Sequence, residues 1–163
     1  MGAEGNGGPY FSFTLEVETD YPGILRTSDF RSGLDLSRLV VLRVPGELRG
    51  DLADLLPRCV ALREFDARDC EELVGDVSLF SQLATKMESF NVSGCTGITG
   101  ELPGALIKII SECKVAKFDG CEGPFTLPPT LGATADSIVK VDLSSLGKAL
   151  RGDVSVFSEA TKM

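Results

Sequence analysis

The sequence predicts an α/β solenoid, in which the chain winds into successive coils that each contribute one short strand. Residues 62–77 and 87–102 carry their apolar residues, a cysteine and a glycine at matching positions, 25 residues apart. Internal similarity at a period of 20–50 residues is the signature of stacked repeats. Each copy opens with the spacing of a short strand, and apolar residues at helical spacing separate one strand from the next.

The N-terminal part differs from the repeats. Residues 1–9 are rich in glycine, and we expect a flexible tail. Residues 10–38 form a capping segment. From Phe11 to Val17 apolar and polar residues alternate, as in a half-buried strand. We expect this strand and the segment Leu25–Leu36 to cover the open end of the first coil.

About five coils of 23–28 residues follow in residues 39–163. One inward residue per strand should stack into a spine, consisting of Leu42, Phe65, Phe90, Phe118 and Val141. In this alignment Cys121 arrives two residues early in its copy. The recurring glycines are expected at a turn with positive φ or at a close approach between coils, namely Gly50, Gly75, Gly100 and Gly152. Helical spacing predicts short helices or 3₁₀ turns within 51–61, 78–86 and 102–114.

A second duplication lies near the C-terminus. The segment Gly75-Asp76-Val77-Ser78-Leu79-Phe80-Ser81 recurs as Gly152-Asp153-Val154-Ser155-Val156-Phe157-Ser158, and Thr85-Lys86-Met87 recurs as Thr161-Lys162-Met163. Met87 opens a coil, so Met163 stands where another coil should begin. Because a solenoid needs a polar cap at each end, we expect an uncapped C-terminal end. Either the sequence belongs to a longer chain or another subunit covers this end.

The pattern resembles the leucine-rich repeat family, most closely the plant-type consensus L-x-x-L-x-L-x-x-N/C-x-L-x-G-x-L/I-P. The resemblance covers residues 39–163, and Gly100-Glu101-Leu102-Pro103 matches the end of the consensus directly. Phenylalanine replaces a leucine in three copies, and Cys70 and Cys95 take the usual asparagine position. The resemblance implies a right-handed superhelix with a concave parallel sheet and short helices or 3₁₀ turns on the convex side.

Composition argues against several classes of function. The 24 acidic residues exceed the 16 basic ones, for a net charge of −8, and no Lys/Arg-rich run is present. This charge is unsuited to nucleic acid or an anionic membrane, and no apolar run approaches the roughly 20 residues that span a bilayer. The chain has no histidine, which removes Ser-His-Asp and Cys-His catalysis and His-containing metal sites. We expect no catalytic residue, no metal and no cofactor.

The cysteines and three short motifs bear on the compartment. Five cysteines are an odd number, and no secretory signal opens the chain, so we expect reduced thiols in an intracellular compartment, either the cytoplasm or an organelle interior. Two Arg-Gly-Asp triplets, at 49–51 and 151–153, fall on the repeat glycine and are interpreted as structural. The glycosylation sequon at 91–93 lies within a predicted strand. It is discounted as well because glycosylation requires the secretory pathway, for which the sequence shows no signal.

The outward strand positions would form the concave face, the usual ligand surface of this family. One row across the strands is expected to hold Arg43, Asp66, Asn91, Asp119 and Asp142, and the next row Val41, Glu64, Ser89, Lys117 and Lys140. Like charges on strands roughly 4.8 Å apart repel, so Lys117 and Lys140 would neutralise the aspartates. Two interpretations stay open, a solvated mixed-charge sheet and a site for a basic or polar segment of a partner protein.

The favoured function is a non-catalytic protein–protein interaction module, a scaffold surface that binds a partner protein. Two alternatives are a structural subunit of a large protein assembly and the sensor fragment of a longer receptor or enzyme. Fold by itself does not choose among them.

Overall fold

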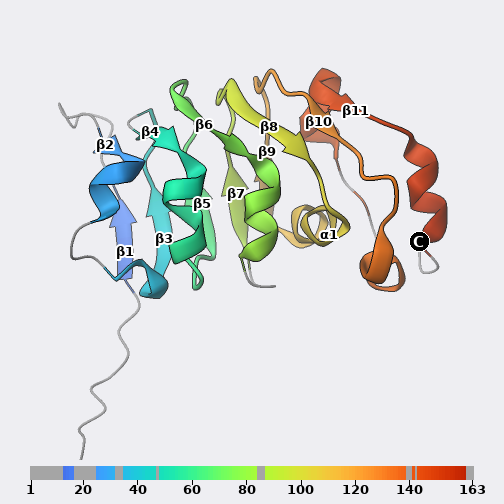
Figure 1. The fold of residues 1–163 in the computed structure, drawn as a ribbon, viewed down its shortest axis with the longest axis horizontal. Helices are drawn as coiled ribbons and strands as arrows, with labels where there is room; N and C mark the ends of the chain where they lie inside the picture. The colour runs from blue at the N-terminus through green and yellow to red at the C-terminus, as the bar shows by residue number, and fades with distance from the viewer. Residues whose placement is uncertain are drawn as a thin grey trace, which may run out of the picture.

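The computed structural model describes residues 13–16, 25–31, 35–46, 48–83, 87–138, 141 and 143–160. The expected tail at 1–9, most of the capping segment's first half, and Lys140 and Asp142 lie outside the described residues. The fold is α/β, with two parallel sheets of five and six strands and few helices (Figure 1). Apolar residues from both sheets and from the connecting segments form one buried core.

The five-stranded sheet contains the strands expected from the repeat pattern. Its order is β1-β3-β5-β7-β9, and every pair is parallel. The strands are β1 (Phe13–Glu16), β3 (Leu39–Arg43), β5 (Glu64–Asp66), β7 (Ser89–Asn91) and β9 (Val115–Lys117). The predicted N-terminal strand is therefore the first strand of this sheet, paired with β3.

The six-stranded sheet was not expected from the sequence. Its order is β11-β10-β8-β6-β4-β2, again all parallel. The strands are β2 (Leu25–Arg26), β4 (Leu48–Asp51), β6 (Leu73–Asp76), β8 (Gly97–Glu101), β10 (Phe125–Thr126) and β11 (Leu150–Arg151). From β1 to β10 the chain alternates between the two sheets, and the segment that supplies one strand to each is called a repeat unit below.

Three recurring glycines lie inside strands of this second sheet, which corrects the expectation of a turn. Gly50, Gly75 and Gly100 have positive φ, and a Cβ on Gly75 would lie 2.8 Å from the Cβ of Leu52 in the preceding unit. The expected close approach between units is therefore present. A residue without a side chain is needed because the backbone of one unit rests on the side chains of the unit before it.

Short helices return the chain to the five-stranded sheet. The segments 51–61, 78–86 and 102–114, predicted as helical, contain η3 (Leu52–Asp54) with η4 (Leu56–Arg58), η5 (Val77–Gln82) and α1 (Gly104–Glu112). The other 3₁₀ segments are η1 (Thr27–Arg31), η2 (Leu36–Arg38), η6 (Gly132–Ser137), η7 (Ser144–Ala149) and η8 (Val154–Glu159). Asp51 and Asp76 cap η3 and η5, because their side chains accept hydrogen bonds from backbone N–H groups two residues later.

Aromatic rings occupy the centre of the core. The Phe90 ring lies 4.3 Å from that of Phe80, 5.0 Å from that of Phe118 and 6.2 Å from that of Phe65, measured between centroids. All four rings are almost fully buried, and Phe118 also meets Phe125. The expected stack of Phe65 and Phe90 is present, since these two residues are direct partners between β5 and β7.

The expected spine is wrong at its fourth residue, Phe118, and its fifth, Val141, lies in no strand. The residue of β9 opposite Phe90 is Ala116, not Phe118. Phe118 follows β9 as Val92 follows β7, and the N–H of Val92 donates to the carbonyl of Lys117. Cys121 is therefore not early, because it stands three residues after Phe118 just as Cys95 stands three residues after Val92. The Phe118 ring still reaches Phe90 because the small Ala116 leaves space beside it.

Candidate interaction face

The outer face of the five-stranded sheet brings together five of the eight residues predicted as a partner site. The strand register places Arg43, Asp66, Asn91 and Lys117 in one row, and Val41, Glu64, Ser89 and Val115 in the next. Lys117 thus stands in the row where Asp119 was expected. Asp119 lies in the turn after β9, while Lys140 and Asp142 lie outside the described residues. The correction follows from the two-residue shift of the unit that contains β9.

Arg43 is paired with carboxylates on both neighbouring strands. Its guanidinium lies 2.5 Å from Glu64 on β5 and 3.5 Å from Glu16 on β1. The hydrogen bond from Arg43 to Glu64 raises the pKa of the arginine. These half-exposed pairs contribute little to stability, and one cation facing two carboxylates leaves this part of the face negatively charged.

A second charged row lies one residue before the strands. Glu88 pairs with Lys114 at 2.6 Å and with Arg63 at 3.5 Å. The hydrogen bond from Lys114 holds the pKa of Glu88 below its ordinary value and raises that of the lysine. Sequence reasoning missed this row, although the offsets of 25 and 26 residues between its members are those of the repeat.

Two predicted face residues bond the backbone of the turn that follows them. Asn91 Oδ1 accepts a hydrogen bond from the N–H of Ser93 at 3.1 Å, and Asp66 Oδ1 accepts one from the N–H of Arg68 at 3.3 Å. Asn91 is only 9% exposed, so the amide of the sequon is engaged and almost covered. These two side chains shape the turns at one end of the face, and the Asp66 carboxylate also pairs with Arg68 at 3.4 Å.

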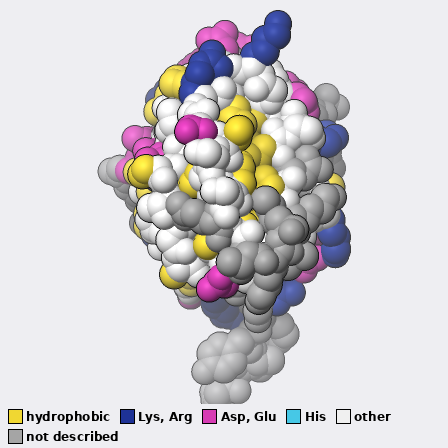
Figure 2. Space-filling model, turned by 90° about the vertical axis from the view of Figure 1, so that its right-hand side faces the viewer, with side chains coloured by type: hydrophobic (Ala, Val, Ile, Leu, Met, Phe, Trp, Pro, Cys, Tyr) yellow, Lys and Arg dark blue, Asp and Glu magenta, His cyan; other side chains and the backbone are white. Residues whose placement is uncertain are grey.

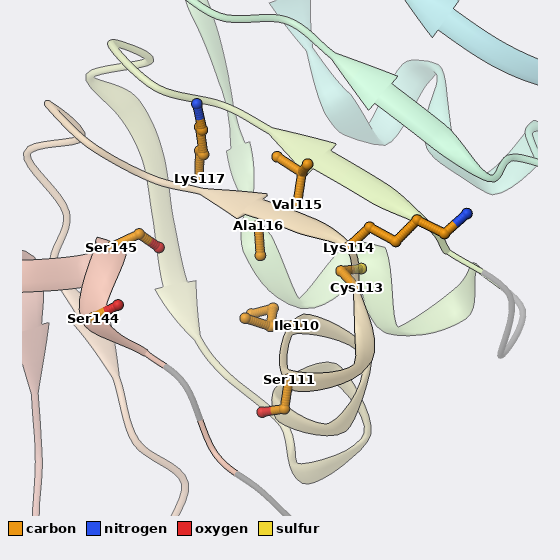
Figure 3. A pocket seen from close by; sticks show the side chains of 9 residues that line it. All are labelled: Ile110, Ser111, Cys113, Lys114, Val115, Ala116, Lys117, Ser144 and Ser145. Atoms are coloured by element: carbon orange, nitrogen blue, oxygen red, sulfur yellow. The ribbon is translucent and has the colours of Figure 1, made fainter.

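A hollow of about 380 Å³ lies beside β9, at the end of the sheet. Figure 3 shows that its lining comes from β9, from the end of α1 and from η7, and that Lys117 and Lys114 extend away from its centre. Ser111, Ser144 and Ser145 bring hydroxyl groups to it. Burial raises the pKa of Cys113, also in the lining, to about 11, so its thiol is protonated at neutral pH. These groups suit hydrogen bonding rather than nucleophilic attack.

The cysteines at the asparagine position join successive units. The thiols of Cys70, Cys95 and Cys121 donate to the carbonyls of Val44, Ala67 and Val92, each in the preceding unit, at 3.2, 2.9 and 3.0 Å. They therefore take the bonding position that the resemblance assigns to asparagine. All five cysteines are free thiols, and no group of three potential metal ligands forms among the described residues.

The buried thiols make the stability of the protein sensitive to alkaline pH. Burial raises the pKa of Cys95 to about 12 and that of Cys59, Cys113 and Cys121 to about 11, from an ordinary value of 9.0. The unfolded chain loses these protons first, so the stability present below pH 9 falls as the pH rises toward 11–12. Each thiol contributes a slope of about 1.4 kcal/mol per pH unit at most.

Urea denaturation at pH 8 and pH 10.5 measures this slope. The Cys121→Ala variant should lose less free energy of unfolding between the two pH values than the wild-type chain. Lysine and tyrosine titrate equally in both proteins and cancel. An unchanged slope would show that the Cys121 thiol ionises as readily in the folded as in the unfolded chain.

The Arg-Gly-Asp triplets are part of the repeat structure. Asp51 and Asp153 each accept a hydrogen bond from a backbone N–H two residues later, at 2.8 Å, and so cap η3 and η8. Arg49 pairs with Glu72 at 2.7 Å. The Arg151 guanidinium donates to the backbone carbonyls of Lys148 and Leu150, so the carboxylates and guanidinium groups of both triplets are engaged within the molecule.

Comparison of the chain with protein-family models, curated proteins and solved structures found no match. The leucine-rich repeat assignment therefore stays a prediction from the repeat pattern. None of the helices in the described part of the chain has the length and apolar character that crossing a bilayer requires.

Proposed function

We propose that this chain is a leucine-rich-repeat-like solenoid that acts as a non-catalytic protein-interaction module. It binds a partner protein through the outer face of the five-stranded sheet. One observation supports this most directly: matched positions of successive units form continuous outward rows across parallel strands. A flat, polar surface of this kind presents many hydrogen-bonding groups to an extended partner without enclosing a small molecule.

The charges of the face define the partner's chemistry. Glu16, Glu64 and Asp66 make one part of the face acidic, while Lys117 makes the β9 end basic. A polar segment that crosses the strands, with basic groups toward β1–β5 and an acidic group toward β9, complements this arrangement. Arg43 and Glu88 are already paired within the face, so such a segment competes with internal ion pairs. We therefore propose a moderate affinity that weakens as salt is added.

We also propose an intracellular, reducing compartment for this module. Four of the five cysteines are buried, and none forms a disulfide. The thiols of Cys70, Cys95 and Cys121 donate hydrogen bonds to the preceding unit. Oxidation of these thiols would remove those donors. A reducing environment keeps these thiols from oxidation and so preserves the hydrogen bonds that they donate.

The face is tested with two double variants that change charge equally. Asp66→Lys with Ser89→Lys places two cations on the outer face, on β5 and β7. Thr99→Lys with Glu101→Lys makes the same change on β8 of the other sheet. Proteins captured from cell extract by the wild-type chain should bind the first variant about tenfold less, which is ~1.4 kcal/mol, and the second variant unchanged.

Quantitative mass spectrometry of the captured proteins reads out this comparison. Equal retention by both double variants would remove the outer face from consideration as the binding surface. Equal loss from both would point to a general effect of charge rather than to a site.

A further inference from the structure

The hollow beside β9 continues the proposed interaction face. Val115 and Lys117 line it, and they are also the β9 members of the two outward rows of the face. A partner segment that crosses the strands from β1 toward β9 therefore reaches the hollow after the last strand of the sheet. What the hollow can bind then decides what the end of that segment carries.

The lining of the hollow has the opposite charge balance from the chain as a whole. Acidic residues outnumber basic ones by 24 to 16 in the sequence. Two lysines and three serines line the hollow, and none of the described residues around it is an aspartate or a glutamate. The hollow is therefore a place where this acidic protein can accept a negatively charged group.

The hollow also differs from the end of the molecule that carries β11 and η8. Figure 2 looks onto that end and shows hydrophobic side chains gathered near its centre. The ammonium and hydroxyl groups that line the hollow instead offer hydrogen-bond donors. A polar occupant thus suits the hollow better than an apolar one.

The two lysines of the lining are not equivalent. Lys114 Nζ lies 2.6 Å from the Glu88 carboxylate, so its charge is already balanced within the protein. Lys117 is exposed, and none of the ion pairs in the described part of the chain involves it. Its flexible four-carbon stem can turn the ammonium from the direction seen in Figure 3 toward the mouth of the hollow. Lys117 is thus the cation that a ligand can use.

Ser145 supplies a second donor from the opposite wall. Figure 3 shows its side chain on η7, with the hydroxyl on the side that faces Ala116 of β9. The Ser111 hydroxyl, by contrast, already donates to the carbonyl of Ile107 at 2.8 Å. An oxygen-bearing group that enters the hollow therefore meets a hydroxyl from η7 and an ammonium from β9.

We propose, resting on the function proposed above, that the hollow binds an acidic side chain of the partner segment. The carboxylate accepts hydrogen bonds from the Lys117 ammonium and the Ser145 hydroxyl. Hydrogen bonds to a charged group are stronger than those between neutral groups. The hollow therefore fixes the direction in which the segment crosses the face, with its acidic end at β9.

Peptides of random sequence displayed on phage provide the probe. They are selected on the immobilised chain, and we expect the selected peptides to share a basic residue and, at a fixed spacing, an aspartate or glutamate. The tightest binder is then made as a synthetic peptide and measured by fluorescence anisotropy. Lys117→Glu should weaken its binding about tenfold. Replacing the acidic residue of the peptide by lysine should restore most of that loss, because the pair of charges is then reversed.

Two further variants separate the hollow from a general effect of charge. Lys148→Glu makes the same charge change at an exposed lysine of η7 that does not line the hollow, and it should alter binding by less than about twofold. Ser145→Ala removes the second donor and should weaken binding about fivefold. It should have no effect on a peptide whose acidic residue is replaced by alanine, because the hydroxyl then has no carboxylate to bind.

The acidic occupant is overturned if reversing both charges restores nothing, or if Ser145→Ala binds as tightly as the wild-type chain. Selected peptides with an apolar residue in place of the acidic one would overturn it as well. The proposed function fails in a different way, namely if the peptides bind the Asp66→Lys, Ser89→Lys variant of the outer face as tightly as the wild-type chain. A selection that yields no binding peptide overturns both.

Discussion

Replacing Phe90 by alanine should lower the free energy of unfolding by about 3–5 kcal/mol, the usual cost of removing a large buried ring. Phe90 is 2% exposed and contacts the rings of Phe65 and Phe80 in the preceding repeat unit and of Phe118 in the following one. Its removal leaves a cavity where both sheets and η5 meet. Urea denaturation followed by circular dichroism measures the loss.

Phe157→Ala is the matched control for this substitution. It makes the same chemical change in η8, near the C-terminal end of the described chain. The Phe157 ring is only half-buried there, so less contact is lost. The loss of stability should be clearly smaller than that of Phe90→Ala. Equal losses would contradict the position of Phe90 at the centre of the core.

Gly75→Ala should cost about 2–5 kcal/mol, although it adds a single methyl group. The new Cβ would lie 2.8 Å from the Cβ of Leu52, which is fully buried and has no space to move. The positive φ of Gly75 adds backbone strain in any residue with a side chain. The variant should therefore force two neighbouring units apart, and thermal unfolding should report a lower melting temperature.

Gly132→Ala separates the two causes. Gly132 also has positive φ, but nothing lies within 4 Å of the position that its Cβ would take. This variant should show only the backbone cost, about 1–2 kcal/mol. If both variants lost the same amount, the close approach between units would not explain the glycine of the repeat.

The repeat unit of β9 and β10 shows how sequence alignment reached the wrong register. Aligning Phe118 with Phe90 and aligning Cys121 with Cys95 give registers that differ by two residues. The sequence analysis aligned the phenylalanines. The hydrogen bond from the Cys121 thiol to the carbonyl of Val92 has the same geometry as the corresponding bonds of Cys70 and Cys95. Regular bonds between backbones set the register, while a ring can reach its neighbours from a shifted position.

The predicted interaction face was affected by the same error. Arg43, Glu64, Asp66 and Asn91 were placed correctly because the alignment of the repeats gave the observed offsets of 23 residues from β3 to β5 and 25 from β5 to β7. Asp119 was misplaced because the offset changes to 26 residues at β9. The ion pairs of Glu88 were not found, because pairing depends on side-chain reach across strands as well as on position in the repeat.

The sequence by itself determined the period, the strands of the five-stranded sheet, the helical returns and the positions of cysteine and glycine. These features are encoded locally, so each copy carries its own signal. Only the tertiary structure decided the second sheet, the register of the unit that contains β9, the partners of each charge and the exposure of Val154. Those properties depend on what the neighbouring unit places opposite a residue, so segments 75–81 and 152–158, which differ only at Leu79 and Val156, can end in different environments.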